Sequence, residues 1–301
     1  MSTFAPPRWR PRRAAIIGIG LLGGSVGLAL RRAWPDLPVI GVARSQATLS
    51  AAMAIGAATE VTDDLSVACR DCDLVLVATP VDLVAAAVCQ AAEVSAADAL
   101  ITDVGSTKAK IVAAVASDSR AAKLFVGSHP IAGSEKSGPQ HASSELFQGR
   151  LVVVTPGPDT SPTLIERATT LWGQFGGRVT IASPAEHDRL LAATSHLPHL
   201  VAAAMAALLP PEADSFAGSG WRDTTRVASG SAEIWSAICL DNAAAIEQEL
   251  QRMITQLQHL RVAVADGDAA AIEQLLLTAQ ASRNRVNAQL SPSPASNQLN
   301  S

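Results

Sequence analysis

The chain has 301 residues, of which 48% are hydrophobic and 17% are charged, as expected for a folded protein with a core rather than a disordered one. Its formal net charge of −4 provides no basic surface for nucleic acid or for an anionic membrane. A small anionic ligand would have to be bound by a few local cations. The chain has no tyrosine, so His, Asp, Glu, Lys and Cys remain as candidate acids, bases and nucleophiles.

The N-terminal segment 1–13 is basic and precedes an apolar run at 14–30, a combination that resembles a signal peptide. The run contains five glycines and is shorter than the roughly 20 residues that cross a bilayer. A strand, a turn and a helix start explain it better. We therefore expect residues 1–13 to be a flexible N-terminus, and the protein to be cytoplasmic with no membrane partner.

The four cysteines are too few for a disulfide framework in a chain of this length. Cys69 and Cys72 form a CxxC pair, but neither a second pair nor a nearby histidine completes a zinc ligand set. We interpret this spacing as chance and predict no metal. The cysteine content fits a reducing cytosol.

From Ala14 to Ser183, short apolar runs alternate with helix-like stretches such as Gln46–Gly56 and Val81–Val94. This alternation predicts a Rossmann-type doubly wound parallel sheet in an α/β dinucleotide-binding domain over residues 14–183. The predicted strands are Ala14–Gly18, Pro38–Ala43, Asp73–Thr79, Ala99–Asp103, Leu124–Gly127, Leu151–Thr155 and Arg178–Ala182.

After Ser183 the pattern is helical, and we predict an all-helical substrate and dimerisation domain over 184–290, with a disordered tail at 291–301. Glu186–Leu209 is expected to be a long helix that is interrupted or kinked near Pro198. A heptad seam over 241–266 favours a homodimer, although packing within one subunit is the alternative. The seam residues are Ile246, Leu250, Met253, Leu257, Leu260 and Val264.

A GxGxxG motif follows the first predicted strand and opens the helix that we expect over Ser25–Arg32. In this context Gly18 permits a tight turn, Gly20 lets the backbone approach a pyrophosphate, and Gly23 lets the helix pack against the strand. The motif predicts a dinucleotide site, with a turn of no function as the alternative. Its residues are Gly18, Gly20, Leu21, Leu22 and Gly23.

The end of the second strand indicates which dinucleotide binds. NAD sites usually carry Asp or Glu there to hold the ribose 2′-hydroxyl, whereas this chain has Ala43, Arg44 and Ser45. Arg44 could pair with a 2′-phosphate and Ser45 could donate a hydrogen bond to it. We predict a preference for NADP, with NAD and a surface arginine as the alternative.

Polar residues also follow the third, fourth and fifth predicted strands, at the sheet edge where ligands of open α/β folds bind. Thr79 and Pro80 are expected near the nicotinamide half of the cofactor, and Asp103 beside it. A neutral His129 could accept a proton from an alcohol while hydride leaves its carbon, and Ser106 could orient the same hydroxyl.

The segments TDVGSTK (102–108), GSHPIAGSEKSG (127–138), SHLPH (195–199) and GWRDTTR (220–226) resemble those of prephenate and arogenate dehydrogenases, the tyrosine-pathway enzymes. The resemblance spans roughly Ala14 to Val286. It implies oxidative decarboxylation of prephenate to 4-hydroxyphenylpyruvate, or of arogenate to tyrosine, with hydride transfer to NADP or NAD.

Roles for individual residues also follow from the resemblance. His129 is expected to polarise the ring hydroxyl with support from Ser106, and Arg226 to grip a substrate carboxylate beside Arg222. His196 and His199 are expected to line the helical side of the cleft, where metal ligation is the less favoured alternative. Glu135 stands at a position where prephenate-using members of the family commonly have an acidic residue. The resemblance also implies that Trp235 is an aromatic residue of the dimer interface.

Three other questions stay open at the sequence level. The first alternative is a 3-hydroxyacid dehydrogenase, which would use a catalytic lysine in its helical half. Residues 180–301 contain no lysine, which counts against this alternative. A non-catalytic NADP sensor would need no convergence of His129, Ser106 and Arg226. Glu135 and Lys136 do not decide between prephenate and arogenate. We expect neither a fused chorismate mutase nor a regulatory domain, and any inhibition by tyrosine to act within the cleft.

Overall fold

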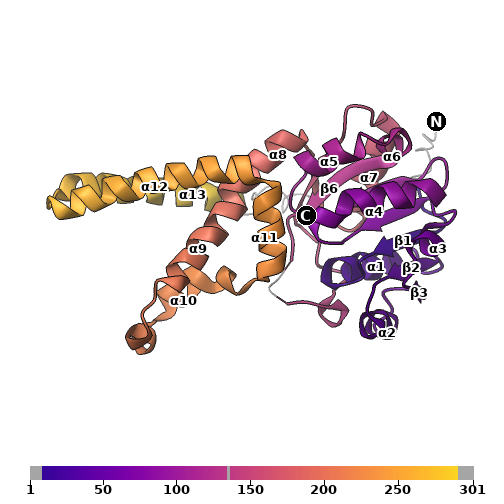
Figure 1. Cartoon of the computed structure of the whole chain (residues 1–301), viewed down its shortest axis with the longest axis horizontal. Helices are drawn as coiled ribbons and strands as arrows, with labels where there is room; N and C mark the ends of the chain where they lie inside the picture. The colour runs from indigo at the N-terminus through magenta and orange to yellow at the C-terminus, as the bar shows by residue number, and fades with distance from the viewer. Residues whose placement is uncertain (1–8, 134–135, 291–301) are drawn as a thin grey trace, which may run out of the picture. The chain divides into compact units, whose positions relative to one another are not determined.

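The computed structural model describes residues 9–133 and 136–290, which form an eight-stranded sheet and the helices around and after it (Figure 1). The strand order is β3-β2-β1-β4-β5-β6-β7-β8, and every neighbouring pair is parallel except β6 and β7. The strands are β1 Ala14–Ile17, β2 Val39–Val42, β3 Glu60–Thr62, β4 Leu74–Val77, β5 Leu100–Asp103, β6 Phe125–Pro130, β7 Leu151–Thr155 and β8 Arg178–Ile181.

Side chains alternate between the two faces along a strand, and β1, β2, β4, β5 and β6 are buried throughout. The middle of the sheet is therefore covered on both faces, as the apolar strands predict. Ile16 and Ile17 are adjacent in β1 but belong to two different core clusters. One cluster also takes in residues of α1, α2 and α7, and the other takes in residues of α3, α4, α5 and α6. These helices are α1 Leu21–Ala33, α2 Gln46–Ala54, α3 Leu65–Cys69, α4 Val81–Val94, α5 Ala109–Val115, α6 Ser119–Leu124 and α7 Pro162–Gln174.

Two features of the sheet differ from the prediction. β3 is an extra edge strand of three residues, none of them buried, so it lacks the apolar run by which a strand is recognised in sequence. β7 runs antiparallel to β6. A parallel neighbour requires a crossover, usually an α-helix, and the described part of the connection at 131–150 contains only a short 3₁₀ turn at Pro139–His141.

The end of the basic N-terminal segment is held against the sheet rather than flexible. The backbone N–H groups of Arg12 and Arg13 donate to the Asp73 carboxylate at 2.9 to 3.0 Å, and the Arg12 guanidinium pairs with it. The guanidinium carbon of Arg167 lies over the Trp9 ring, 5.5 Å from the centroid of that ring. Residues 1–8 and the tail predicted at 291–301 lie outside the described residues.

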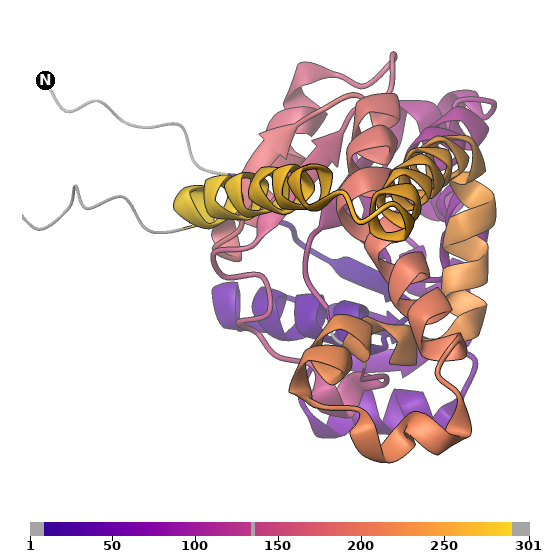
Figure 2. The ribbon, with the colours of Figure 1, turned by 90° about the vertical axis from the view of Figure 1, so that its left-hand side faces the viewer.

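The long helix expected after Ser183 is interrupted just before Pro198, one of the two outcomes predicted for it. α8 (Pro184–Leu191) passes through a π-helical turn at Ala192–His196 into α9 (Leu197–Ala207). Pro198, in the first turn of α9, has no N–H to donate to the preceding turn, which accounts for the break. α10 (Ser219–Thr225) packs on α9, and Ile238 of α11 (Ala232–Asp241) joins the core cluster beside α4 (Figures 1 and 2).

By chain contacts, the compact unit that holds the sheet extends to Ile246, whereas we expected a boundary after Ser183. The run Pro184–Ala207 is long and apolar enough to cross a membrane by length and composition. It also carries His187, Asp188 and His196, all buried within the same compact unit. A helix that forms part of a polar site accounts for it better than a membrane span.

The second unit, from Glu247 onward, consists of most of α12 (Ala243–Ala265) and all of α13 (Ala269–Leu290). The heptad seam is present on α12, but Leu257 and Val264 are 55% and 61% exposed. Ile246, at the start of the seam, is buried. Two of the six seam residues are therefore exposed, three are half-buried and one is buried.

Candidate active site

The carboxyl end of β1 turns into α1 through the glycine motif. Gly18 has φ +88°, and a Cβ there would lie 2.6 Å from the carbonyl oxygen of Ala78. A Cβ at Gly23 would lie 2.2 Å from the Gly18 carbonyl oxygen, whereas one at Gly20 would meet no atom within 4 Å. Gly20 thus faces open space at the start of α1, with no side chain capping the helix. This arrangement suits a pyrophosphate at a helix N-terminus.

A cavity of about 620 Å³ continues from this turn along the ends of β1, β2 and β4. Its lining includes Gly18, Gly20, Arg44, Ser45, Thr48, Asp63, Thr79 and Pro80. Arg44 and Ser45 are exposed, and the Ser45 hydroxyl accepts a hydrogen bond from the Thr48 N–H at 3.5 Å. Asp63, just after β3, was not singled out from the sequence because β3 itself was not predicted. The volume and the glycine turn fit a dinucleotide.

Four predicted cofactor residues, Leu21, Leu22, Gly23 and Asp103, do not line this cavity. Gly23 is buried where α1 packs against the turn after β1. Leu21 and Leu22 are half-buried in the first turn of α1, and Leu22 packs against the core. Asp103 is fully buried, with its carboxylate paired with the equally buried Lys108. The same carboxylate accepts hydrogen bonds from the N–H groups of Gly105 and Ser128, both at 2.9 Å. Its side chain therefore holds the strand ends together and is not available to a cofactor.

His129, near the end of β6, is part of a chain of buried hydrogen bonds. Its Nδ1 lies 2.8 Å from Nε2 of His187, and Nδ1 of His187 lies 2.7 Å from Oδ1 of Asp188. The two rings meet edge to face, with centroids 5.1 Å apart. Burial lowers the pKa of His129 well below its ordinary value of 6.5, and the neighbouring His187, Lys108 and His196 lower it further. His129 is therefore neutral at physiological pH.

Asp188 also fixes the loop that carries Ser106. Its two carboxylate oxygens accept hydrogen bonds from the backbone N–H groups of Lys108 and Ala109, each at 2.8 Å. These groups belong to the start of α5, directly after Ser106, which is partly exposed. Asp188 thus joins the β5–α5 loop to α8. The sequence reasoning missed His187 and Asp188, although a His–Asp pair in the first turns of an apolar helix was a visible signal.

His196 and His199 lie at the junction of the π turn with α9. Asn242 Nδ2 lies 3.2 Å from Nδ1 of His196, whose buried Nε2 has no hydrogen-bond partner among the described residues. Desolvation lowers the pKa of His196 to about 4. His199 stacks on Trp235, with centroids 3.4 Å apart and planes at 12°. In the described part of the chain, no group of three or more His, Cys, Asp or Glu side chains could hold a metal ion.

The two predicted substrate arginines are placed close together in the chain. Arg222 lies on α10, and Arg226 begins the 3₁₀ turn that follows it; both are exposed. α10 and this turn pack against α9, which carries His199. Glu135 lies outside the described residues.

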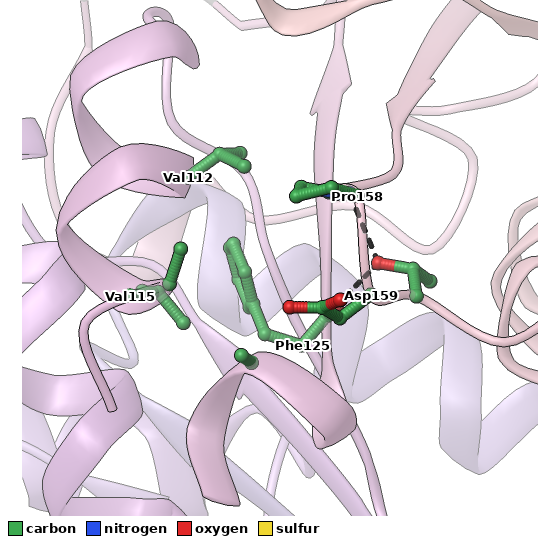
Figure 3. Close-up of a pocket in the computed structure, with 9 residues that line it drawn as sticks. Val112, Val115, Phe125, Pro158 and Asp159 are labelled. Carbon is green, nitrogen blue, oxygen red and sulfur yellow. Dashed lines mark hydrogen bonds between the residues drawn. The ribbon is translucent and has the colours of Figure 1, made fainter. Parts of the chain in front are cut away.

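A second hollow, between α5, β6 and the loop after β7, can be excluded as the site (Figure 3). Its volume is about 10 Å³, enough for roughly one water molecule. Its walls include Val112, Val115, Phe125 and Pro158, and Asp159 is the one ionisable residue among those that line it. It contains none of the predicted site residues.

Comparison with known proteins agrees with this geometry. Residues 26–181 match the family model "Prephenate dehydrogenase, nucleotide-binding domain", and residues 183–278 match "Prephenate dehydrogenase, dimerization domain". The chain is 37% identical to the cyclohexadienyl dehydrogenase of Zymomonas mobilis, over 85% of this chain and 90% of that protein. It is 33% identical to the prephenate dehydrogenase of Bacillus subtilis, over 88% and 73% of the two chains.

Solved structures give the same result. The prephenate dehydrogenase of Aquifex aeolicus, in complex with hydroxyphenyl propionate and NAD+, aligns with a TM-score of 0.84 at 29% identity, over 92% of this chain and 99% of that one. The arogenate dehydrogenase of Synechocystis aligns with a TM-score of 0.74 at 28% identity, over 91% and 99%. A 3-hydroxybutyryl-CoA dehydrogenase of Ralstonia eutropha, 17% identical with a TM-score of 0.51, shares the fold alone. The chain belongs to the prephenate dehydrogenase family.

Proposed function

We propose that the chain catalyses the NAD(P)-dependent oxidative decarboxylation of prephenate to 4-hydroxyphenylpyruvate, or of arogenate to tyrosine. The observation that carries this proposal is the buried, neutral His129 at the same sheet edge as the glycine turn. A neutral imidazole there suits the removal of a proton from a ring hydroxyl. The relatives include proteins named prephenate, arogenate and cyclohexadienyl dehydrogenases, which supports both substrates.

The dinucleotide would be held by the turn at Gly18 and Gly20, by Thr79 and Pro80, and by Arg44, all of which line the cavity. When bound, its nicotinamide accepts the hydride from the hydroxyl-bearing ring carbon. We favour NADP because no carboxylate stands at the end of β2, where it would repel a 2′-phosphate. Arg44 and Ser45 are exposed and line the cavity, so they can meet such a phosphate.

In this mechanism His129 takes the hydroxyl proton onto Nε2 as hydride leaves the ring carbon, and Ser106 orients the hydroxyl. The bond between the ring and its carboxylate then breaks, carbon dioxide leaves, and the electron pair of that bond aromatises the ring. His129 returns the proton to the phenolic oxygen, so the reaction needs no other acid. Aromatisation supplies the driving force, and the protein mainly positions its ligands and manages one proton.

The substrate carboxylates require cations, because the chain as a whole is negatively charged. We assign carboxylate binding to Arg226, with Arg222 as a neighbouring cation, since guanidinium groups bind carboxylates through two parallel hydrogen bonds. His196 and His199, with pKa values lowered by burial, line the cleft as neutral groups. Trp235 stacks on His199 and so holds the imidazole ring of His199 in place.

We also infer a cytoplasmic homodimer formed through the helical part of the chain at 184–290. The match of residues 183–278 to a dimerisation domain and the exposed seam residues Leu257 and Val264 on α12 support this inference. An amphipathic seam with exposed apolar residues is typical of a helix that packs against a second copy.

The proposed function is tested by initial rates of reduced-cofactor formation, with prephenate and arogenate each combined with NADP and NAD. We expect turnover with at least one substrate, and a higher kcat/KM with NADP than with NAD. Absence of turnover in all four combinations, with NADP still bound, would overturn the proposal and favour a non-catalytic sensor.

Replacement of His129 by asparagine removes the base and is expected to lower kcat by about 10²–10⁴-fold, with cofactor affinity unchanged. In the wild type, the pKa of His129 is depressed below 6.5, so the base stays neutral as the pH falls through 6.5. The acidic limb of kcat/KM should therefore begin below pH 6.5. A limb above 6.5, or near-normal kcat in the variant, contradicts the assignment.

Arg226→Ala is expected to raise KM for prephenate by at least about 10-fold, because a charge-assisted bidentate contact is lost. The Kd of the cofactor should not change. Arg70→Ala is a matched control, since Arg70 is exposed and precedes β4 at the opposite, amino edge of the sheet. Equal KM values in the two variants would remove Arg226 from substrate binding.

Ala43→Glu places a carboxylate at the end of β2, where it can accept hydrogen bonds from a ribose and repels a 2′-phosphate. We expect the ratio of the NADP and NAD dissociation constants, measured by quenching of tryptophan fluorescence, to move toward NAD by at least about 10-fold. An unchanged ratio would show that the end of β2 does not determine the choice between a 2′-phosphate and a 2′-hydroxyl on the cofactor ribose.

A further inference from the structure

We propose that His187 and Asp188 are positioning residues that hold His129 as the tautomer with its proton on Nδ1 and its lone pair on Nε2. This inference rests on the proposed function, because only a reaction that needs a base gives the tautomer a consequence. Neither residue touches the substrate in this scheme. They act through the two hydrogen bonds at 2.7 and 2.8 Å that join Asp188, His187 and His129.

The direction of the chain of hydrogen bonds is set at Asp188. Its carboxylate is 4% exposed and already accepts from the backbone N–H groups of Lys108 and Ala109. A group that receives two backbone donors is favoured as an ionised acceptor. The contact with His187 must then be a third donation to the carboxylate, from Nδ1–H of that ring.

The remaining steps follow from the number of protons on each ring. We assign a single proton to the His187 ring, on the Nδ1 that faces Asp188, so its Nε2 carries only a lone pair, which can accept but not donate. His129, which is neutral because burial lowers its pKa, must therefore donate from Nδ1–H to that lone pair. Its own Nε2 is left without a proton and is ready to act as a base.

The position of Asp188 is fixed from several sides. Its backbone carbonyl accepts a hydrogen bond from Asn242 Nδ2 at 2.8 Å, and its side chain is tied to the start of α5. The neighbouring cation, Lys108, is engaged by Asp103 and so does not compete for Asp188 through its side chain. A rigid acceptor of this kind defines one orientation of His187 and, through it, one of His129.

Two substitutions at His187 separate positioning from packing. The amide oxygen of Gln reaches about as far as Nε2 of histidine and can accept from His129, whereas Leu fills the space but offers no acceptor. We expect His187→Leu to lower kcat by about 10²-fold or more, with KM changed only a few-fold, and His187→Gln to recover at least about 10-fold of that loss. A buried packing role predicts the reverse order, because an apolar side chain is better tolerated in a core.

The same pair of substitutions at the exposed His141 serves as the control and should leave kcat unchanged. A kcat for His187→Leu equal to or above that of His187→Gln would overturn the positioning role.

A spectroscopic reading tests the tautomer without any turnover. In protein labelled with ¹⁵N at histidine, ring correlations assigned by comparison with His129→Asn should show His129 protonated at Nδ1 and unprotonated at Nε2 at neutral pH. His187→Leu should abolish this fixed pattern. A wild-type His129 protonated at Nε2 overturns the inference even when prephenate is turned over. The predicted pattern in a protein inactive with both substrates would instead overturn only the proposed function.

Discussion

The buried carboxylate of Asp188 is the contact on which the geometry of the candidate active site depends. It accepts hydrogen bonds from two backbone N–H groups at the start of α5 and lies 2.7 Å from Nδ1 of the His187 ring. It thereby connects a loop of the sheet to the helix that begins the second half of the chain. Removing one partner from a buried charge costs about 3–5 kcal/mol, because the other charge or donor set is left uncompensated. The arrangement is therefore held more firmly than a surface loop would be.

A second buried carboxylate, Asp103, completes the support from the sheet side. It pairs with Lys108 and accepts from Gly105 and Ser128, which links the ends of β5 and β6. Ser106 and His129 follow directly on these two strand ends. The two carboxylates thus position the two groups that we assign to the chemistry, while the glycine turn at the end of β1 provides a place for the dinucleotide.

The histidines and arginines that we assign to the substrate cleft differ in charge. Burial lowers the pKa values of His129, His196 and His199, so all three are neutral at physiological pH. In the proposed mechanism, positive charge for the substrate carboxylates comes from the exposed Arg222 and Arg226, which stay protonated at any pH of interest. A neutral base can then accept a proton close to cationic groups.

Much of the fold and part of the site could be predicted from the sequence, because both depend on patterns of residues that are close together in the chain. Apolar strands mark the sheet, and the glycine motif and the polar strand ends mark its binding edge, where Gly20, Ser106 and His129 are found. β3 was missed because a short exposed edge strand leaves no apolar signature. β7 was predicted with its observed bounds, but its antiparallel direction was not, because chain direction leaves no apolar signature.

The supporting chain of hydrogen bonds was missed for a different reason. His129 and His187 are 58 residues apart in the chain, and Asp188 is 80 residues from the backbone N–H of Lys108 that it binds. Such long-range pairs arise only when the fold brings helix and sheet edge together. The buried orientation of Asp103 likewise depends on Lys108 being enclosed beside it.

The most direct test of the central claim is a crystal structure of the chain with oxidised cofactor and the product 4-hydroxyphenylpyruvate. The account predicts that the phenolic oxygen lies within about 2.6–3.2 Å of Nε2 of His129, with Nδ1 still bonded to His187. A phenolic oxygen bound instead by His196 or His199, or a His129 ring turned so that Nδ1 faces the product, would contradict it.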